Sequence, residues 1–277
     1  MISQKYISKL SNRLSMNNDF RITETIIEKD YIISWILTGL SENSLKNNLI
    51  FKEGTCLKKC FFLDYRFSED LDFTLNSEIS IENIIEGFSD ISRNIMSQSG
   101  VKIDIDIDSI IEHRNTFTFF INYEGPLFGR KGKRIKTDCT TKELIVGDNN
   151  ERAILIYPEF IDLPKDKVIF TYNMKEICSE KIIALLDNAR NEPRDLYDIW
   201  YLCYNKHIKI GKLKNIIEKK CEFRNMHLSD IINNLEFKES KLRKTWNLRL
   251  GKQVLSLPEF ESVYRYVKRE IRQTGWS

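Results

Sequence analysis

The 277-residue sequence predicts an α+β fold, in which a front domain with a mixed sheet and flanking helices precedes an all-helical back domain. Two observations support this prediction. Up to residue 172, segments with the two-residue apolar period of strands alternate with segments of helical period. Beyond that point only the helical period is present. We therefore expect two domains, at residues 1–172 and 173–277.

The predicted elements follow one another along the chain with short connections. Helices are expected at residues 22–40 and 81–97 in the front domain, and at 174–187, 194–204, 211–222, 227–237 and 258–273 in the back domain. Strands are expected at 49–51, 101–107, 115–123, 134–140 and 168–172, and a further strand bears Asp70 and Asp72. A Gly-Thr turn and a helix lie between the strand at 49–51 and the Asp70 strand.

The composition is that of an ordinary globular protein, with 42% hydrophobic and 30% charged residues. The N-terminus lacks a charged-then-apolar signal pattern, and no apolar run approaches the length of a membrane span, so we expect a cytoplasmic protein without a membrane partner. The six cysteines show no CxxC spacing, and several lie in apolar periodic segments. This favours buried free thiols over a disulfide or a zinc site.

The net charge of +3 conceals an uneven distribution. From Tyr201 onward the chain has 17 Lys and Arg against 8 Asp and Glu, a net charge of +9, whereas the remainder has 26 against 32, a net charge of −6. An acidic front part and a basic back part suit an enzyme that holds a metal at one end and a polyanion at the other. Solvated lysine-rich helices would give the same composition, which by itself does not separate the two interpretations.

The segment from Phe51 to Leu75 contains the strongest candidate site. Asp70 and Asp72 lie two apart on a strand, so their carboxylates are expected to project from the same face and to form an oxygen-rich site suited to Mg²⁺. The Gly54-Thr55 turn opens a helix whose free backbone N–H groups suit a phosphate. This combination is typical of phosphoryl or nucleotidyl transfer.

A second acidic row provides a control for this interpretation. Asp104, Asp106 and Asp108 also alternate along a strand, but the opposite face is uniformly isoleucine, at Ile103, Ile105 and Ile107. That pattern is typical of the solvent face of a half-buried strand. A plain surface strand also remains open as an explanation of Asp70 and Asp72.

Further candidates lie outside this segment. Asp138 lies on a later strand, where it could add a third carboxylate. Lys181 is embedded in an apolar helix and either meets an NTP phosphate or forms an ion pair with Asp195 or Asp198. The GRKGKR loop from Gly129 to Arg134 is either a phosphate-contacting hairpin or an exposed turn.

These segments together resemble the AbiEii family of nucleotidyltransferase toxins. The resemblance runs in order from Glu28-Lys29-Asp30-Tyr31 to the Trp246 region, through FKEGTCLKK, DYRFSEDLDFTL, RIKTDCT, SEKIIALLDNAR and PRDLYDIWYL. Its specific parts are RFSEDLDF and RDLYDIW. The resemblance implies a nucleotidyltransferase domain with a DNA-polymerase-β-like fold and a helical C-terminal domain. It also implies a toxin of a type IV toxin–antitoxin or abortive-infection system, which uses an NTP and Mg²⁺ to add nucleotides to the 3′ end of tRNA.

The family's functional residues are carried over by motif. The resemblance implies an NTP-binding set at Gly54, Thr55 and Ser68, to which we add Lys58 and Arg66 of the same blocks. It implies metal carboxylates at Asp70 and Asp72, with Asp138 in the position of a third, and catalytic roles for Asp70, Asp72, Lys181 and Asp195. One departure is Glu53, where the family usually has a second glycine; its charge is expected to affect NTP binding.

The sequence leaves two hypotheses of different classes open. The first is an active nucleotidyltransferase with an RNA acceptor and a cognate antitoxin from the same operon. The second is a nucleotide- or RNA-binding module without turnover. Retention of all four catalytic residues favours the first. A variant of the first, with a protein hydroxyl as acceptor, is also open.

Overall fold

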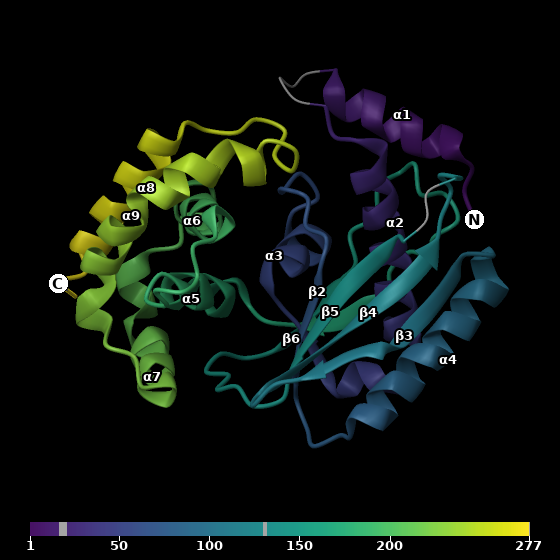
Figure 1. Cartoon of the computed structure of the whole chain (residues 1–277), viewed down its shortest axis with the longest axis horizontal. Coiled ribbons are helices and arrows are strands. Elements are labelled where there is room, and N and C mark those ends of the chain that lie inside the picture. Colours follow the sequence, from purple (N-terminus) through teal and green to yellow (C-terminus); the bar gives the residue numbers. More distant parts are fainter. Residues whose placement is uncertain (17–20, 130–131, 277) are drawn as a thin grey trace. The chain divides into compact units, whose positions relative to one another are not determined.

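The computed structural model describes residues 1–16, 21–129 and 132–276. Two compact units are present, one formed by residues 1–143 and 149–172 and the other by residues 144–148 and 173–277 (Figure 1). The first contains the sheet and the second is helical, which confirms the predicted fold class. Among the helices that the structure describes, none has the length and apolar composition required to cross a membrane.

The first unit is built on a seven-stranded mixed sheet with the strand order β3-β4-β5-β2-β1-β7-β6. Its strands are β1 (Leu49–Phe51), β2 (Leu71–Leu75), β3 (Lys102–Glu112), β4 (Thr116–Glu124), β5 (Arg134–Thr140), β6 (Asn150–Ala153) and β7 (Val168–Thr171). The β2–β5 and β1–β7 pairs are parallel, and the other neighbouring strands are antiparallel.

Three longer helices and three short helical segments belong to the first unit. The longer helices are α1 (Gln4–Ser15), α2 (Glu24–Glu42) and α4 (Ile81–Ser99). The short segments are a 3-10 turn at Ser44–Asn47, α3 (Glu53–Cys56) and a five-residue π-helical turn, Leu57–Phe61, that continues α3. Helix α4 begins where the Ser80 side chain accepts a hydrogen bond from the N–H of Asn83, and it ends at Gly100 in the left-handed conformation. Phe88 of α4 packs against Phe73 of β2 and Phe119 of β4, so the apolar core lies between this helix and one face of the sheet.

The second unit consists of helices around an aromatic centre. These are α5 (Met174–Ala184), α6 (Pro193–Trp200), α7 (Lys214–Arg224), α8 (Ile231–Leu250) and α9 (Phe260–Arg272), with short helical turns at Tyr201–Asn205, Ile210–Leu213 and Leu228–Asp230. Trp246 of α8 contacts the rings of Tyr197 and Phe260. Asn173 caps α5 by accepting a hydrogen bond from the N–H of Glu176, and Pro193 occupies the first turn of α6, as its fixed φ favours.

The structure corrects several sequence predictions. Asp70 lies immediately before β2 rather than within it, and its carbonyl oxygen accepts a hydrogen bond from the Thr55 hydroxyl (2.6 Å). The helix expected at 227–237 is a short turn followed by a longer helix that ends at Leu250. Helix α1 and strand β6 were not predicted; all four residues of β6 are exposed, so they show no apolar alternation.

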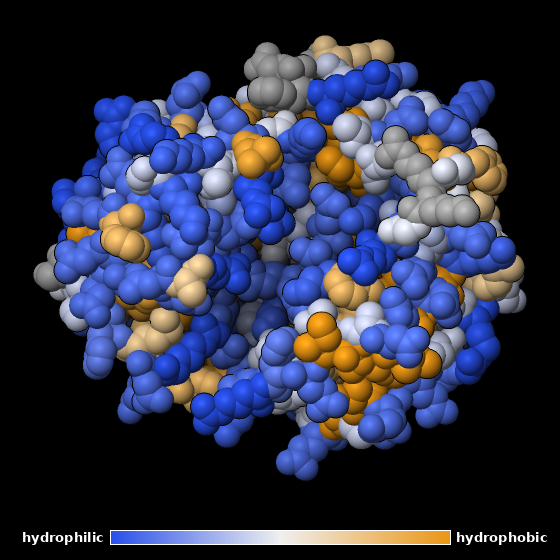
Figure 2. All heavy atoms as spheres, in the orientation of Figure 1, coloured by the Kyte–Doolittle hydropathy of each residue, from blue (hydrophilic) through white to orange (hydrophobic). Residues whose placement is uncertain are grey.

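The acidic row on β3 only partly matches the prediction of one solvent face and one buried face. Asp104 and Asp108 are exposed, and Ile105 on the opposite face is buried. Ile107 is nevertheless 65% exposed, because the pairing of β3 with β4 is irregular after Asp106. The prediction that Ile107 is buried is therefore wrong, and an apolar patch in the lower right of Figure 2 lies over this strand.

Candidate functional site

The carboxylate site is centred on β2 and β5. In the parallel register, Asp72 lies directly opposite Asp138, so the two side chains leave the same face of the sheet from neighbouring strands. Asp70 precedes Asp72 by two residues. Burial raises the pKa of Asp72 to about 7, and the nearby carboxylates of Glu53, Asp70 and Asp138 add to this shift. The site is therefore a concentration of negative charge that favours a bound cation.

Asp138 already has two polar partners. Its carboxylate accepts a hydrogen bond from the Thr118 hydroxyl on β4 and pairs with Lys136 at 2.5 Å. Within the described part of the chain, no three Asp, Glu, His or Cys side chains are arranged to hold a metal ion by themselves. Mg²⁺ is, however, commonly bound through one or two protein carboxylates together with water and substrate phosphates. Asp70 and Asp72 fit that kind of site.

Gly54 and Thr55 lie within the short helix α3 rather than in a turn before it, and they pack against the segment before β2. A Cβ atom on Gly54 would lie 2.4 Å from a terminal nitrogen of Arg66 and 3.3 Å from the Ser68 hydroxyl. The glycine thus lets the Arg66 and Ser68 side chains approach the backbone of α3. The structure brings together four of the five residues that the sequence analysis placed around the NTP: Gly54, Thr55, Arg66 and Ser68.

Lys58, the fifth residue of that set, is buried in the protein interior. Its ammonium group donates hydrogen bonds to the carbonyl oxygens of Leu63 and Tyr65 and to the hydroxyl of Tyr157, and lies 4.0 Å from the centre of the Phe67 ring. Burial lowers the pKa of Lys58 to about 7. A role of Lys58 in NTP binding would therefore be indirect, through the loop that leads to Ser68.

Glu53 has a positive φ of 67°. A residue with a side chain is strained in this left-handed region, which glycine enters freely, so the backbone explains the glycine that the family usually has here. The Glu53 carboxylate also lies close enough to the carboxylate site to add, after burial, to the raised pKa of Asp72.

The second unit contains the other two predicted catalytic residues. The Lys181 ammonium lies 3.0 Å from Asp195 and 3.4 Å from Asp198, and Arg190 pairs with Asp195 at 2.6 Å. Burial alone would raise the pKa of Asp195, but Lys181 and Arg190 outweigh it and hold this pKa well below its ordinary value. Lys181 therefore belongs to a buried ion-pair network with both acids that the sequence analysis considered.

The sequence analysis assigned no role to the Glu28-Lys29-Asp30-Tyr31 segment of α2. Each of its four side chains reaches a different part of the first unit. The partners are Lys133 and the Leu127 N–H for Glu28, Glu69 for Lys29, Lys59 for Asp30 and Asp162 for Tyr31. Two of these partners, Lys59 and Glu69, belong to the motifs around the carboxylate site. The sequence did contain a pattern that could have predicted these contacts, because charged residues within an apolar helix require partners.

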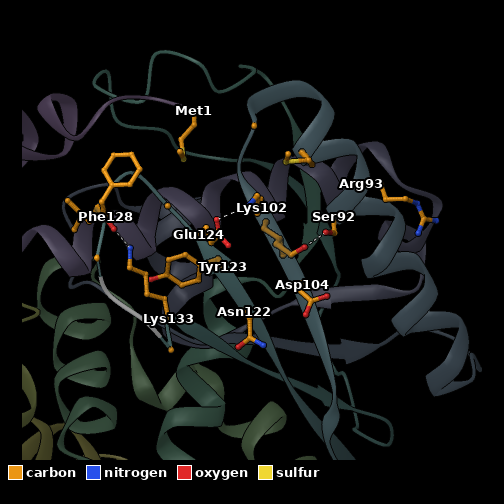
Figure 3. A pocket seen from close by; sticks show the side chains of 17 residues that line it. Met1, Ser92, Arg93, Lys102, Asp104, Asn122, Tyr123, Glu124, Phe128 and Lys133 are labelled. Atoms are coloured by element: carbon orange, nitrogen blue, oxygen red, sulfur yellow. Dashed lines mark hydrogen bonds and ion pairs between the residues drawn. The ribbon is translucent and has the colours of Figure 1, made fainter.

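A cavity of about 1290 Å³ lies at the beginning of β3 and the end of β4 (Figure 3). Asp104, Asn122 and Tyr123 contribute to its wall. Lys133, immediately before β5, also lines it. None of the predicted catalytic, metal or NTP-binding residues lines it. Arg130 and Lys131 of the predicted GRKGKR loop lie outside the described residues.

Comparison with known proteins identifies the family. The family model of the nucleotidyl transferase AbiEii toxins of type IV toxin–antitoxin systems matches residues 35–266. The chain belongs to the AbiEii family. Among solved structures it is similar to MenT4, a nucleotidyltransferase toxin from Mycobacterium tuberculosis, with a TM-score of 0.64 and 14% sequence identity over 99% of this chain and 90% of MenT4. No curated protein matches the chain.

The AbiEii match confirms the family resemblance drawn from the sequence, and the likeness to MenT4 confirms the fold. The chain is thus a nucleotidyltransferase toxin of the type IV toxin–antitoxin class. Both RFSEDLDF and RDLYDIW lie within the matched residues.

Proposed function

We propose that this AbiEii-family toxin uses Mg²⁺ to transfer a nucleotide from an NTP to an RNA acceptor, most simply the 3′ end of tRNA, and thereby blocks translation and growth. The observation that supports this proposal best is the register of β2 and β5, which sets Asp72 opposite Asp138, with Asp70 beside them. Gly54 and Thr55 of α3 lie at the start of the same segment.

The carboxylates of Asp70 and Asp72 would hold the metal. Asp138 would become a third ligand if its carboxylate left the ion pair with Lys136 and bound the metal instead. When bound, Mg²⁺ neutralises charge on the phosphates of the NTP and on the departing pyrophosphate. The raised pKa of Asp72 supports this role, because a cation relieves the repulsion among these carboxylates.

The remaining residues would bind and orient the NTP. The backbone N–H groups of Gly54 and Thr55 would face its phosphates, while Arg66 and Ser68, packed on Gly54, would contact the same group from the other side. In the reaction the acceptor hydroxyl oxygen forms a bond to the α-phosphorus as the bond to the β-phosphate oxygen breaks. Pyrophosphate leaves with the electron pair, and the hydroxyl proton is released.

Lys181 is proposed to contact the NTP phosphates, with Asp195 as the acid that orients it. The support is the family motif together with the 3.0 Å contact between the two side chains. Lys181→Met should raise the KM for NTP and reduce transfer. Asp198→Asn is the matched structural control, because it removes the second acidic neighbour of Lys181 and leaves the proposed pair intact. Equal loss of NTP binding in both variants would reduce Lys181 to a structural ion-pair partner.

The cellular parts of the proposal follow from the type IV toxin–antitoxin class, and the RNA-contacting surface follows from the net charge of +9 beyond Tyr201. We propose a cytoplasmic site of action and an antitoxin from the same operon. We also propose that basic residues of α8 and α9 contact the RNA backbone.

The decisive experiment incubates the purified protein with each radiolabelled NTP, Mg²⁺ and total tRNA. We expect label on RNA with one or a subset of the four NTPs, and its loss when EDTA removes the metal. Periodate oxidation of the 3′-terminal diol of the RNA should prevent labelling. Label on a protein instead would favour a protein hydroxyl as acceptor, and NTP or RNA binding without label on either would favour a binding module.

A further inference from the structure

The face of β4 that carries Thr118 has one residue of unexpected character. The residues on this face are Thr116, Thr118, Phe120, Asn122 and Glu124. All are polar except Phe120, whose ring is half-buried, while the opposite face supplies the aromatic core through Phe117 and Phe119. An aromatic ring on the polar face of a strand has no role in that core.

Arg134 of β5 covers this ring. Its guanidinium carbon lies 4.1 Å from the centre of the Phe120 ring, and the Arg134 side chain is exposed. A guanidinium held against an aromatic ring presents its other flat surface outward, which is the arrangement on which an unpaired base stacks.

The Phe120–Arg134 stack lies in line with the carboxylate site. Asp138, Lys136 and Arg134 alternate along β5 and share one face, with about 7 Å between successive members. In the antiparallel register, Thr118 lies opposite Asp138 and Phe120 opposite Lys136. The Phe120 ring and the two basic side chains thus form a row from the acidic site toward the beginning of β5, with Asp106 of β3 opposite Phe120 at its outer side.

The row continues to the cavity shown in Figure 3. Asn122 lies opposite Arg134 in the register and also lines that cavity, together with Asp104 of β3. A strand of nucleic acid that follows the row therefore has open space beyond Arg134.

We propose that this row, defined as Phe120, Arg134 and Lys136, binds the single-stranded end of a nucleic-acid acceptor. One base stacks on the Phe120–Arg134 pair, Lys136 and Arg134 lie against the backbone phosphates, and the terminal hydroxyl points toward the carboxylate site. Single-stranded nucleic acid is the fitting ligand because stacking requires a base free of its partner, whereas a duplex keeps its bases inside. This inference rests on the proposed function and specifies its acceptor subsite.

The test is direct binding of a fluorescent, unstructured RNA of roughly 12 nucleotides, measured by anisotropy without NTP. Phe120→Leu keeps apolar volume but removes the ring, and Arg134→Gln removes the planar cation. Each should weaken binding roughly tenfold, while Phe120→Trp should retain it. The matched control is Arg152→Gln. Arg152 belongs to β6, at the opposite edge of the sheet, and its guanidinium carbon lies 4.9 Å from the centre of the Phe61 ring. This variant should bind as the wild type does.

Several results would overturn the inference: wild-type affinity in both Phe120→Leu and Arg134→Gln, an equal loss in Arg152→Gln, or an equal loss of affinity for a duplex of the same sequence. So would absence of RNA binding by the wild type. Thermal melting checks that the variants fold. If Phe120→Leu does not fold, the Arg134→Gln variant decides the test, because the Arg134 side chain is exposed. A wild type that binds this RNA but transfers no nucleotide would refute the proposed function and leave the binding row in place.

Discussion

Glu53 has a left-handed backbone conformation at the position where the AbiEii family usually has glycine. We expect Glu53→Gly to be more stable than Glu53→Ala by about 1 kcal/mol, because both lose the carboxylate but only glycine relieves the strain. Urea unfolding of the two variants measures the difference. Equal stability would show that the backbone there is unstrained.

Glu53→Gln separates the charge from the conformation. The Glu53 carboxylate contributes to the raised pKa of Asp72, so its removal should lower the KM for NTP by reducing negative charge beside the triphosphate. The measurement is the KM for NTP at saturating acceptor. An unchanged or higher KM would mean that the Glu53 carboxylate does not oppose NTP binding.

Lys58 makes a pH-dependent contribution to stability. Burial lowers its pKa from 10.5 to about 7 in the folded protein. Between these values the unfolded chain binds more protons than the folded chain, so the free energy of unfolding should rise with pH from about 7 to 10.5. Below pH 7 both states are protonated, and the cost of the buried charge is fully present. Lys58→Met should lack this rise, and parallel pH curves for the two proteins would contradict the account.

At the scale of elements, α2 organises the first unit through buried charge. The Asp30–Lys59 pair is 2.8 Å long, and both side chains are almost fully inaccessible to solvent. Asp30→Asn leaves the Lys59 charge buried without its counterion and should cost about 3–5 kcal/mol. Lys46→Met, which removes the half-buried partner of the exposed Glu151, should cost no more than about 1 kcal/mol. Similar urea midpoints for the two variants would contradict this role of α2.

The sequence predicted elements well where periodicity and burial agree, and less well elsewhere. Strands 49–51 and 134–140 have the predicted bounds because all three residues of the first are buried and alternate residues of the second are buried in the core. Strand β6 and the exposed Ile107 were missed because their pairing follows from backbone hydrogen bonds rather than from an apolar pattern. The opposition of Asp72 and Asp138 depends on the register between two strands that are distant in the sequence, which no local pattern contains.

At the scale of the whole molecule, the structure refines the charge distribution that the sequence predicted. In the second unit, Arg243 pairs with Glu239 and Glu261, and Lys268 pairs with Glu236. These pairs do not alter the net charge of +9, which already counts the glutamates, but they make Arg243 and Lys268 less available to an RNA backbone than basic side chains without such ion pairs.

Two double variants test the contribution of the second unit to tRNA binding. Lys244→Gln with Arg265→Gln should lower the slope of log affinity against log salt by about two units, one for each phosphate contact removed. Arg243→Gln with Lys268→Gln should change it less, because these groups already have acidic partners. An unchanged slope in both would move backbone recognition away from α8 and α9.

The most direct test of the account compares two acidic rows on the same sheet. Asp70→Asn and Asp72→Asn should abolish transfer of labelled nucleotide to RNA and relieve growth inhibition, while the proteins remain folded by thermal melting. Asp106→Asn and Asp108→Asn, which make the same chemical change on β3 at positions that do not line the cavity of Figure 3, should transfer nucleotide at the wild-type rate. Loss of activity in both pairs, or in neither, would contradict the claim that Asp70 and Asp72 form the metal site.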